Sequence, residues 1–497
     1  MHVRFLTGNS KMGALLPVQA LSRRSASGAA SGERMGLEPD ACVVEKCDDT
    51  GISPSESSLG SEGKLASILR SSSYGRIMPI HMDQATAAVR PKRKASIEDL
   101  EELGRRATEV IDEARRISLT PETKKKLRTF TMSEVCNLLS LHPTAYYELI
   151  RTNPEFEGSK VDRKRLFSLA EIHRIQGHLG LLPRQRFGIE RAIAISVANF
   201  KGGVAKTFTA VTLAQYMAMR GYRTLVIDTD PQASLTSSFG VNPSEVSDWN
   251  TILPYLYGRA EVEKLGEEWP SSFKSTIQPT YWSGLDIVAA NLTLYTGEFV
   301  LGLRREIAKN SDEPFAFHRP LHDALEDIRA DYDVIIIDNP PALSLSTTGA
   351  IFAADGLILP TPAETLDFES ARAFMCLAAE ILKAVRGTFG TNKVLEIFRI
   401  LVTRFSGRDA EKKIANRILD VFGDWAIQEP MVASSSVQKI GSEWKTLYEE
   451  DPRGKGRSVL KRALDAANDV NGLIEAEIID VFREWREKRL AATREAA

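Results

Sequence analysis

The chain has 497 residues, 43% of them hydrophobic and 26% charged, and its formal net charge is −2. This length predicts roughly two to four domains, and the near-neutral charge excludes a global basic field, so any contact with nucleic acid must come from local basic patches. Four cysteines are too few for a disulfide framework and fit a reducing cytoplasm, and no apolar run approaches the roughly 18 residues of a membrane span.

The N-terminal part divides into two segments. Residues 1–92 are rich in Ser, Gly and Ala without hydrophobic periodicity, so we expect a disordered extension. Residues 93–120 predict a helix that begins with a capping-box pattern at Ser96 and Asp99. Its apolar residues then repeat at alternating three- and four-residue steps: Leu100, Leu103, Ala107, Val110, Ala114 and Ile117. Such a stripe is typical of helices that pack against each other, which makes this segment a candidate dimerisation helix; the alternative is packing on its own domain.

Residues 121–184 predict a small module of short helices. Thr131 with Glu134 predicts the start of one helix, Pro143 the first turn of a second, and Ser168 with Glu171 the start of a third. A basic loop separates the second and third helices, and the order resembles the MerR-like winged helix-turn-helix; the alternative is a small bundle with a solvated charge run. The candidates for DNA contact are Tyr146, Tyr147 and Arg151 in the major groove and Lys160, Arg163, Lys164 and Arg165 in the wing.

Residues 185–497 predict an α/β domain. Apolar runs alternate with helical patterns, and several runs are continuous, which indicates a doubly wound, mostly parallel sheet covered on both faces. The expected strands are residues 193–198, 224–228, 285–289, 334–338, 356–360, 397–403 and 426–428. A helix over residues 207–220 should end at Gly221.

The loop between the first of these strands and this helix has the composition of a phosphate site. It reads Lys201, Gly202, Gly203, Val204, Ala205, Lys206 and Thr207. Small residues let backbone N–H groups curl around phosphates, Lys206 supplies a point charge, and the Thr207 hydroxyl can bind Mg²⁺. A second lysine, Lys201, stands five residues before Lys206.

Acidic residues stand at the ends of two of the predicted strands. Asp228 and Asp230 lie at the carboxyl end of strand 224–228, and Asp338 ends strand 334–338, where it would hold Mg²⁺ through water. In an open parallel sheet these ends share one crevice with the phosphate loop, so the sequence predicts ATP and Mg²⁺ binding there.

These three motifs together resemble the ParA-type partition ATPases of the deviant Walker group. Residues 220–225, 400–405 and 446–449 resemble, more narrowly, the RepA partition ATPases of repABC plasmids. The resemblance covers about residue 95 to the C-terminus. It implies a P-loop NTPase fold and slow ATP hydrolysis that a ParB- or RepB-type centromere-binding partner stimulates. It also implies an ATP-dependent homodimer, non-specific DNA binding on the nucleoid, and repression of the chain's own operon through the N-terminal module.

The resemblance also implies roles for matching residues. Lys201 would reach across the dimer to the partner's phosphates, Lys206 would bind the β- and γ-phosphates, and Asp230 would position the attacking water. Thr207 and Asp338 would hold Mg²⁺. Two positions depart from the family pattern, since Ala205 replaces the more usual Gly and Asn339 a common Thr. The basic candidates for non-specific DNA contact in the later half are Arg404, Arg408, Lys412, Lys413, Lys439 and Lys445.

Three alternatives stay open at this point. A membrane-cycling regulator of MinD type would use an apolar stripe near the C-terminus with a basic flank, although a buried helix explains the stripe as well. The stripe comprises Leu473, Ile474, Ile478, Val481, Phe482 and Trp485. An iron-sulfur reductase of nitrogenase iron-protein type needs cluster cysteines, and Cys376 stands alone. A transcriptional repressor could use nucleotide only as an allosteric ligand.

Overall fold

The computed structural model describes residues 96–118, 125–162, 164–309, 314–433, 445–453 and 457–496, with side chains from 111 to 118 left out. The predictions for residues 1–92, Arg163 and Lys439 lie outside the described residues. The described residues all belong to one unit, residues 94–497.

Helix α2 (Ile97–Ser118) confirms the predicted helix and its start. Ser96 donates its backbone N–H to Asp99 Oδ2 at 3.0 Å, and Asp99 donates its backbone N–H to Ser96 Oγ at 3.1 Å. Its apolar side chains Ile97, Leu100, Leu103 and Val110 are all exposed in the single chain.

The segment from Phe130 to His178 folds into helices and a small sheet. β1 (Phe130–Thr131), α3 (Met132–Leu139), α4 (Pro143–Thr152), β2 (Ser159–Val161), β3 (Lys164–Phe167) and α5 (Leu169–His178) follow in order, with a 3₁₀ turn η1 (Pro154–Phe156) after α4. The capping boxes at Thr131 and Ser168 and Pro143 in the first turn of α4 are present as predicted. The sequence predicted a loop where β2 and β3 form an antiparallel hairpin, and β1 pairs with β3. A short helix α6 (Pro183–Phe187) then leads into the α/β domain.

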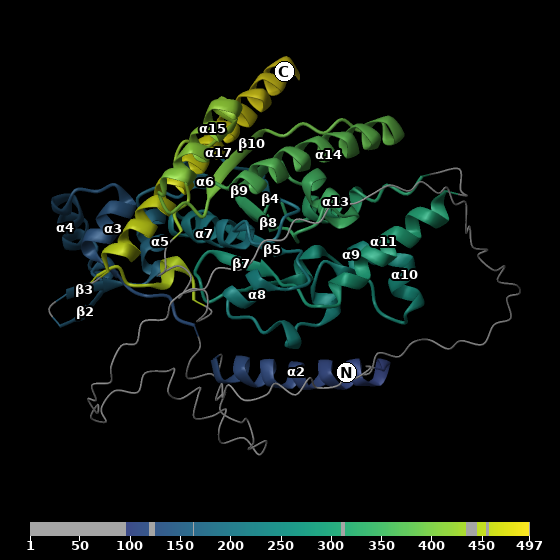
Figure 1. The fold of residues 1–497 in the computed structure, drawn as a ribbon. Helices are drawn as coiled ribbons and strands as arrows, with labels where there is room; N and C mark the ends of the chain where they lie inside the picture. Colours follow the sequence, from purple (N-terminus) through teal and green to yellow (C-terminus); the bar gives the residue numbers. More distant parts are fainter. Residues whose placement is uncertain are drawn as a thin grey trace, which may run out of the picture. The chain divides into compact units, whose positions relative to one another are not determined.

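The α/β domain contains a seven-stranded sheet in the order β10-β9-β4-β8-β5-β7-β6 (Figure 1). Its strands are β4 (Ile193–Val197), β5 (Thr224–Asp228), β6 (Ile277–Pro279), β7 (Leu285–Val288), β8 (Val334–Asp338), β9 (Gly356–Pro362) and β10 (Ile397–Thr403). All neighbours are parallel except the β6–β7 pair at one edge, which confirms the predicted mostly parallel sheet. The sequence missed β6. The strand predicted over residues 426–428 is wrong, since only an isolated bridge joins Ala426 to Ile400.

Helices cover both faces of this sheet. Alternate strand residues such as Ile195 and Ile336 pack with α7 (Lys206–Met219) and α17 (Ser458–Ala496). Their neighbours on the other face pack with α9 (Leu253–Tyr257), α11 (Leu294–Ala308), α12 (Arg319–Glu326) and α13 (Leu345–Ala353), or with α14 (Thr365–Phe389) and α15 (Asp409–Phe422). The remaining short elements are α8 (Ser234–Ser238), α10 (Arg259–Lys264), η2 (Pro243–Glu245), η3 (Asp248–Asn250), η4 (Phe273–Thr276), η5 (Gly423–Trp425) and η6 (Leu447–Glu449).

The apolar stripe of the C-terminal helix belongs to the core. Ile474, Ile478 and Phe482 on α17 are at most 4% exposed and share one cluster with α7 and the N-terminal module. The Glu475 carboxylate accepts hydrogen bonds from Tyr216 Oη at 3.0 Å and from Arg220 Nε at 3.2 Å. Four of the six stripe residues are therefore buried by packing, which contradicts the membrane-surface interpretation, while Leu473 is 42% exposed and Trp485 is partly buried. None of the helices in the described ranges is long and apolar enough to cross a membrane.

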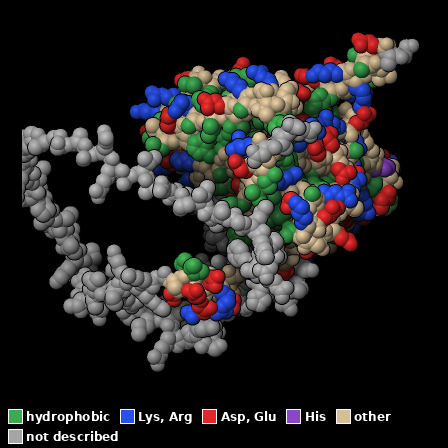
Figure 2. Space-filling model, turned by 90° about the vertical axis from the view of Figure 1, so that its right-hand side faces the viewer, with side chains coloured by type: hydrophobic (Ala, Val, Ile, Leu, Met, Phe, Trp, Pro, Cys, Tyr) green, Lys and Arg blue, Asp and Glu red, His purple; other side chains and the backbone are tan. Residues whose placement is uncertain are grey.

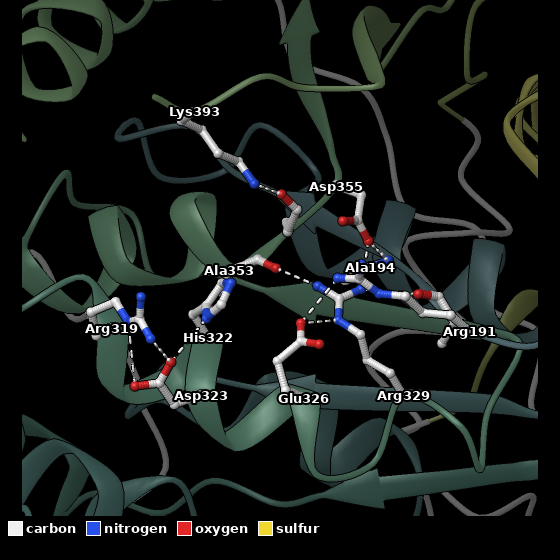
Figure 3. A network of polar contacts seen from close by, with 12 residues as sticks. Arg191, Ala194, Arg319, His322, Asp323, Glu326, Arg329, Ala353, Asp355 and Lys393 are labelled. Atoms are coloured by element: carbon white, nitrogen blue, oxygen red, sulfur yellow. Dashed lines mark hydrogen bonds and ion pairs between the residues drawn. The ribbon is translucent and has the colours of Figure 1, made fainter. Parts of the chain in front are cut away.

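A polar network fixes the amino end of the central strands (Figure 3). The buried guanidinium of Arg329 donates to Ala192 O at 2.9 Å, Ala353 O at 2.9 Å and Asp355 Oδ2 at 2.6 Å. The same Asp355 oxygen accepts from the Ala194 N–H at 2.8 Å. Because one arginine and one aspartate join the starts of β4 and β9, the carboxyl ends of these strands are held in register where the phosphate loop begins.

Candidate nucleotide site

The predicted phosphate loop and acidic residues meet at the carboxyl edge of the sheet. The loop joins β4 to α7, and β8 lies between β4 and β5. In the strand register Asp338 pairs with Val197 on one side and with Asp228 on the other. The sequence prediction that one crevice holds these groups is thus consistent with the sheet order.

The loop backbone has the sharp turns that a phosphate cradle needs. Gly203 has φ +73° and Ala205 has φ +70°, so both adopt the left-handed conformation. For Ala205 this conformation costs about 1–2 kcal/mol, because its Cβ approaches the following carbonyl. Thr403, at the end of β10, supports the strained segment by donating its hydroxyl to Val204 O at 2.9 Å.

Lys206 lies inside the loop rather than in solvent. It is 7% exposed, and its ammonium donates to Lys201 O at 3.1 Å. Burial lowers the pKa of Lys206, while the nearby carboxylates of Asp338 and Asp230 oppose that shift. A buried ammonium with one hydrogen bond to the described residues retains donors for an anionic ligand.

The carboxylate of Asp338 is buried at the end of β8. It is 0% exposed, and neither oxygen has a hydrogen-bond partner of acceptable geometry within the described residues. Burial and then repulsion from Asp228 raise the pKa of Asp338 well above its ordinary value, although Thr207 and Lys206 lie near enough to oppose this. A buried carboxylate without a well-formed hydrogen bond, beside a hydroxyl, fits Mg²⁺, which prefers oxygen ligands.

The two acids after β5 have different surroundings. Asp228 Oδ2 accepts from the Thr236 N–H at 2.9 Å and hydroxyl at 2.7 Å, and Oδ1 accepts from the Asp230 N–H at 3.1 Å. Burial nevertheless raises the pKa of Asp228 to about 7. Asp230 is 9% exposed and uses Oδ1 for the Gln232 N–H at 2.9 Å. Asp228, which the sequence did not assign a role, therefore shapes the loop that presents Asp230.

Lys201 pairs with an acid of its own chain. Its ammonium lies 2.5 Å from Asp367 Oδ1 in the first turn of α14, and its backbone N–H donates to Asn199 Oδ1 at 3.1 Å. The sequence did not single out Asp367, because nothing in the α14 segment marks one acid among several as a partner of the loop. Only the adjacency of β4 and β9 brings the two together.

Two arginines predicted as DNA contacts are engaged elsewhere. Arg404 has φ +53° and donates from Nη1 to Gly203 O at 3.1 Å, so it braces the phosphate loop from outside. Arg408 binds the buried Glu411 carboxylate through Nε at 2.7 Å. Lys412 pairs with Asp409 and Lys445 with Glu450, while Lys413 is exposed.

The N-terminal module gathers part of its predicted DNA-binding set. A hollow of about 540 Å³ is lined by Thr131, Met132, Ser133, Tyr147, Lys160, Lys164 and Arg165. Tyr147 is 52% exposed, with the Arg165 guanidinium 5.8 Å from its ring centroid. The prediction that Tyr146 faces a groove is wrong, since it is 0% exposed and donates to Phe156 O at 2.7 Å. Arg151 does not line the hollow and pairs with Glu148.

Comparison with known proteins agrees with this geometry. Residues 192–396 match a protein-family model described as an AAA domain. The chain is 33% identical over 370 residues to a replication protein A of Rhizobium rhizogenes, covering 72% of this chain and 88% of the relative. It is 29% identical over 340 residues to protein SopA of Escherichia coli K12, covering 67% and 83%. It is 31% identical over 233 residues to the chromosome partitioning protein ParA of Caulobacter vibrioides, covering 46% and 76%.

The family-model match, residues 192–396, extends across the phosphate loop and both acidic strand ends. The two longer relatives match 72% and 67% of the chain, so they also cover much of it outside these motifs. The chain therefore belongs to the family of ParA-like partition ATPases, whose RepA-type and SopA members are among its relatives.

Proposed function

We propose that this chain is a DNA-segregation ATPase that binds Mg²⁺-ATP between the β4–α7 loop and the ends of β5 and β8. The observation that carries the proposal is the meeting of a buried lysine, a glycine loop and an orphaned buried carboxylate at one sheet edge. Lys206 would hold the β- and γ-phosphates, with the backbone N–H groups of Gly202, Gly203, Val204 and Ala205 around them. Thr207 and, through water, Asp338 would hold Mg²⁺.

Each group has a defined task in hydrolysis. Bound Mg²⁺ neutralises charge on the phosphate oxygens. Lys206 adds a positive charge that burial keeps from being screened. Asp230 is nearly buried, and the backbone N–H of Gln232 fixes its orientation through Oδ1; we assign its carboxylate the positioning of the attacking water.

ATP would also control assembly. Lys201, on the same loop as Lys206, would contact the phosphates of a second copy, so that the homodimer forms only with triphosphate bound. A ligand shifts such an equilibrium by its differential affinity for the two states. The exposed apolar stripe of α2 offers a further contact between copies.

DNA binding would use local basic clusters. Figure 2 shows Lys and Arg interspersed with Asp and Glu over the visible face, in keeping with the net charge of −2. The hollow of the N-terminal module combines an exposed tyrosine with Lys160, Lys164 and Arg165, which suits phosphate contact and repression at an operator. Lys412, Lys413 and Lys445 would support non-specific binding on the nucleoid, and a ParB- or RepB-type partner would stimulate hydrolysis and release.

The trans role of Lys201 is tested by sedimentation of the full chain with and without ATP. Wild type should dimerise with ATP, and Lys201→Ala should bind ATP as a monomer without dimerising. Lys461→Ala, which removes an exposed lysine on α17, is the matched control. A Lys201 variant that dimerises like wild type would exclude the trans role.

The DNA-binding role is tested with random duplex. An ATP-dependent shift that weakens steeply with salt is expected. Binding confined to one operator would instead favour a repressor that uses nucleotide as an allosteric ligand.

A further inference from the structure

The lysine expected to act on a partner subunit is held by its own chain in this structure. Lys201 Nζ lies 2.5 Å from Asp367 Oδ1. The lysine side chain is 37% exposed and the aspartate side chain 6%. Lys201 can therefore swing out into solvent, whereas Asp367 cannot follow it.

Asp367 depends on this contact. Within the part of the chain that the structure describes, Lys201 is the one charged partner of the Asp367 side chain. The backbone N–H of Asp367 donates to Glu364 O in the first turn of α14. A buried carboxylate that loses its counter-ion keeps its desolvation penalty without compensation. Moving Lys201 onto a partner's phosphates breaks this ion pair, and the cost of leaving Asp367 without its counter-ion opposes dimerisation.

We propose that Asp367 is a positioning residue that restrains Lys201 in the monomer and thereby sets the ATP and protein concentrations at which the dimer forms. This inference rests on the proposed trans role of Lys201. The triphosphate of a bound partner competes with Asp367 for one ammonium group. A nucleoside diphosphate lacks the γ-phosphate and competes less well for this ammonium. It would leave Lys201 paired with Asp367 and keep the chain monomeric.

The restraint itself can be measured without any dimer. Acylation of Lys201 by an N-hydroxysuccinimide ester, quantified by mass spectrometry in the absence of nucleotide, reports how often its amine is released. Asp367→Asn should speed this modification by roughly five-fold, the upper range for part-exposed ion pairs, with Lys461 as internal reference. Glu369→Gln, which neutralises an exposed acid on the same helix that pairs with Arg372, should leave the rate unchanged. An unchanged rate in Asp367→Asn would overturn the restraint, whatever the dimer does.

The consequence for assembly is measured by sedimentation with a slowly hydrolysed ATP analogue. Asp367→Asn should dimerise at a protein concentration roughly 25-fold lower than wild type, because the dimer releases two such ion pairs and each contributes about five-fold, while Glu369→Gln should match wild type. Loss of dimers in Asp367→Asn with unchanged analogue binding would show that Asp367 orients Lys201 for its partner, and would overturn the proposal.

A double variant separates this inference from the proposed function. Asp367→Asn should give no tightening when Lys201 is already Ala, because the effect runs through that lysine. Tightening in the double variant would overturn the restraint while leaving an ATP-dependent dimer in place. If wild type does not dimerise but Asp367→Asn still speeds acylation of Lys201, the trans role of Lys201 is refuted, whereas its restraint by Asp367 is supported.

Discussion

Two buried aspartates, one just before β8 and one at its end, should respond in opposite directions to replacement by asparagine. Asp338, at the end of β8, is buried with no hydrogen-bond partner in the described chain. Asp333, one residue before β8, is 1% exposed but binds Arg184 at 3.0 Å and Arg223 at 2.9 Å. We expect Asp338→Asn to stabilise the ligand-free protein at pH 8 and Asp333→Asn to destabilise it.

The magnitude for Asp338 follows from proton linkage. An aspartate has an unfolded-state pKa of about 3.9, and the pKa of Asp338 is raised well above that by burial. The stability from this group is therefore present below about pH 4 and is lost as the pH rises toward its folded-state pKa. A buried acceptor left without a hydrogen-bond partner costs about 1–3 kcal/mol. The nearby charge of Lys206 opposes part of this penalty at Asp338, so we expect a gain of about 1–3 kcal/mol.

The loss for Asp333 follows from its hydrogen bonds. Both arginines are more than one-third exposed, so water replaces part of what is lost. Hydrogen bonds to charged groups contribute about 1.5–3 kcal/mol, and we expect a total loss of about 2–3 kcal/mol.

Thermal unfolding of both variants in EDTA, at pH 8 and pH 5.5, checks this reasoning. A kcal/mol shifts Tm by roughly 2–4 °C in domains of 150–250 residues. Asp338→Asn should raise Tm at pH 8 and raise it less at pH 5.5, where wild type has regained part of its stability. A Tm at pH 8 equal to or below wild type would show that Asp338 is compensated, and would remove the main support for a cation at this position.

Four further outcomes concern the site and the module. Lys206→Ala should abolish ATP binding measured by calorimetry, because no other buried ammonium in the described residues lies in the loop. Asp230→Ala should keep ATP-dependent dimers and slow phosphate release by roughly 10²-fold or more; full turnover would refute its role. Arg404→Ala should weaken ATP binding roughly five-fold, about 1 kcal/mol for an exposed charge-assisted hydrogen bond. Weaker DNA binding with unchanged ATP affinity would instead show that Arg404 contacts DNA. Lys164→Ala should weaken duplex binding and lower the slope of log K against log salt concentration by about one. An unchanged slope would show that Lys164 does not contact a DNA phosphate.

Local chemistry explains which elements could be predicted. The capping boxes at Thr131 and Ser168 and the continuous apolar runs of β5 and β8 depend on residues near each other in sequence, and these were predicted at their observed positions. Strand β6 is three residues of mixed burial at the sheet edge, so its period-2 signal is too short to recognise. Residues 426–428 have an apolar pattern, but they meet β10 through a single bridge.

The sequence by itself determined the chemistry of the site: a glycine loop with two lysines, and acids that end two apolar strands. These features are local, because the phosphate cradle is built from consecutive backbone groups and each acid follows its own strand. Only the tertiary structure decided what the other charges do. Strand order brings Asp367 to Lys201 and Arg404 to Gly203, and helix packing buries Tyr146 and most of the stripe of α17. A charged or aromatic side chain has the same sequence signature whether it faces solvent, a ligand or a neighbour 200 residues away, and burial and distance alone separate these cases.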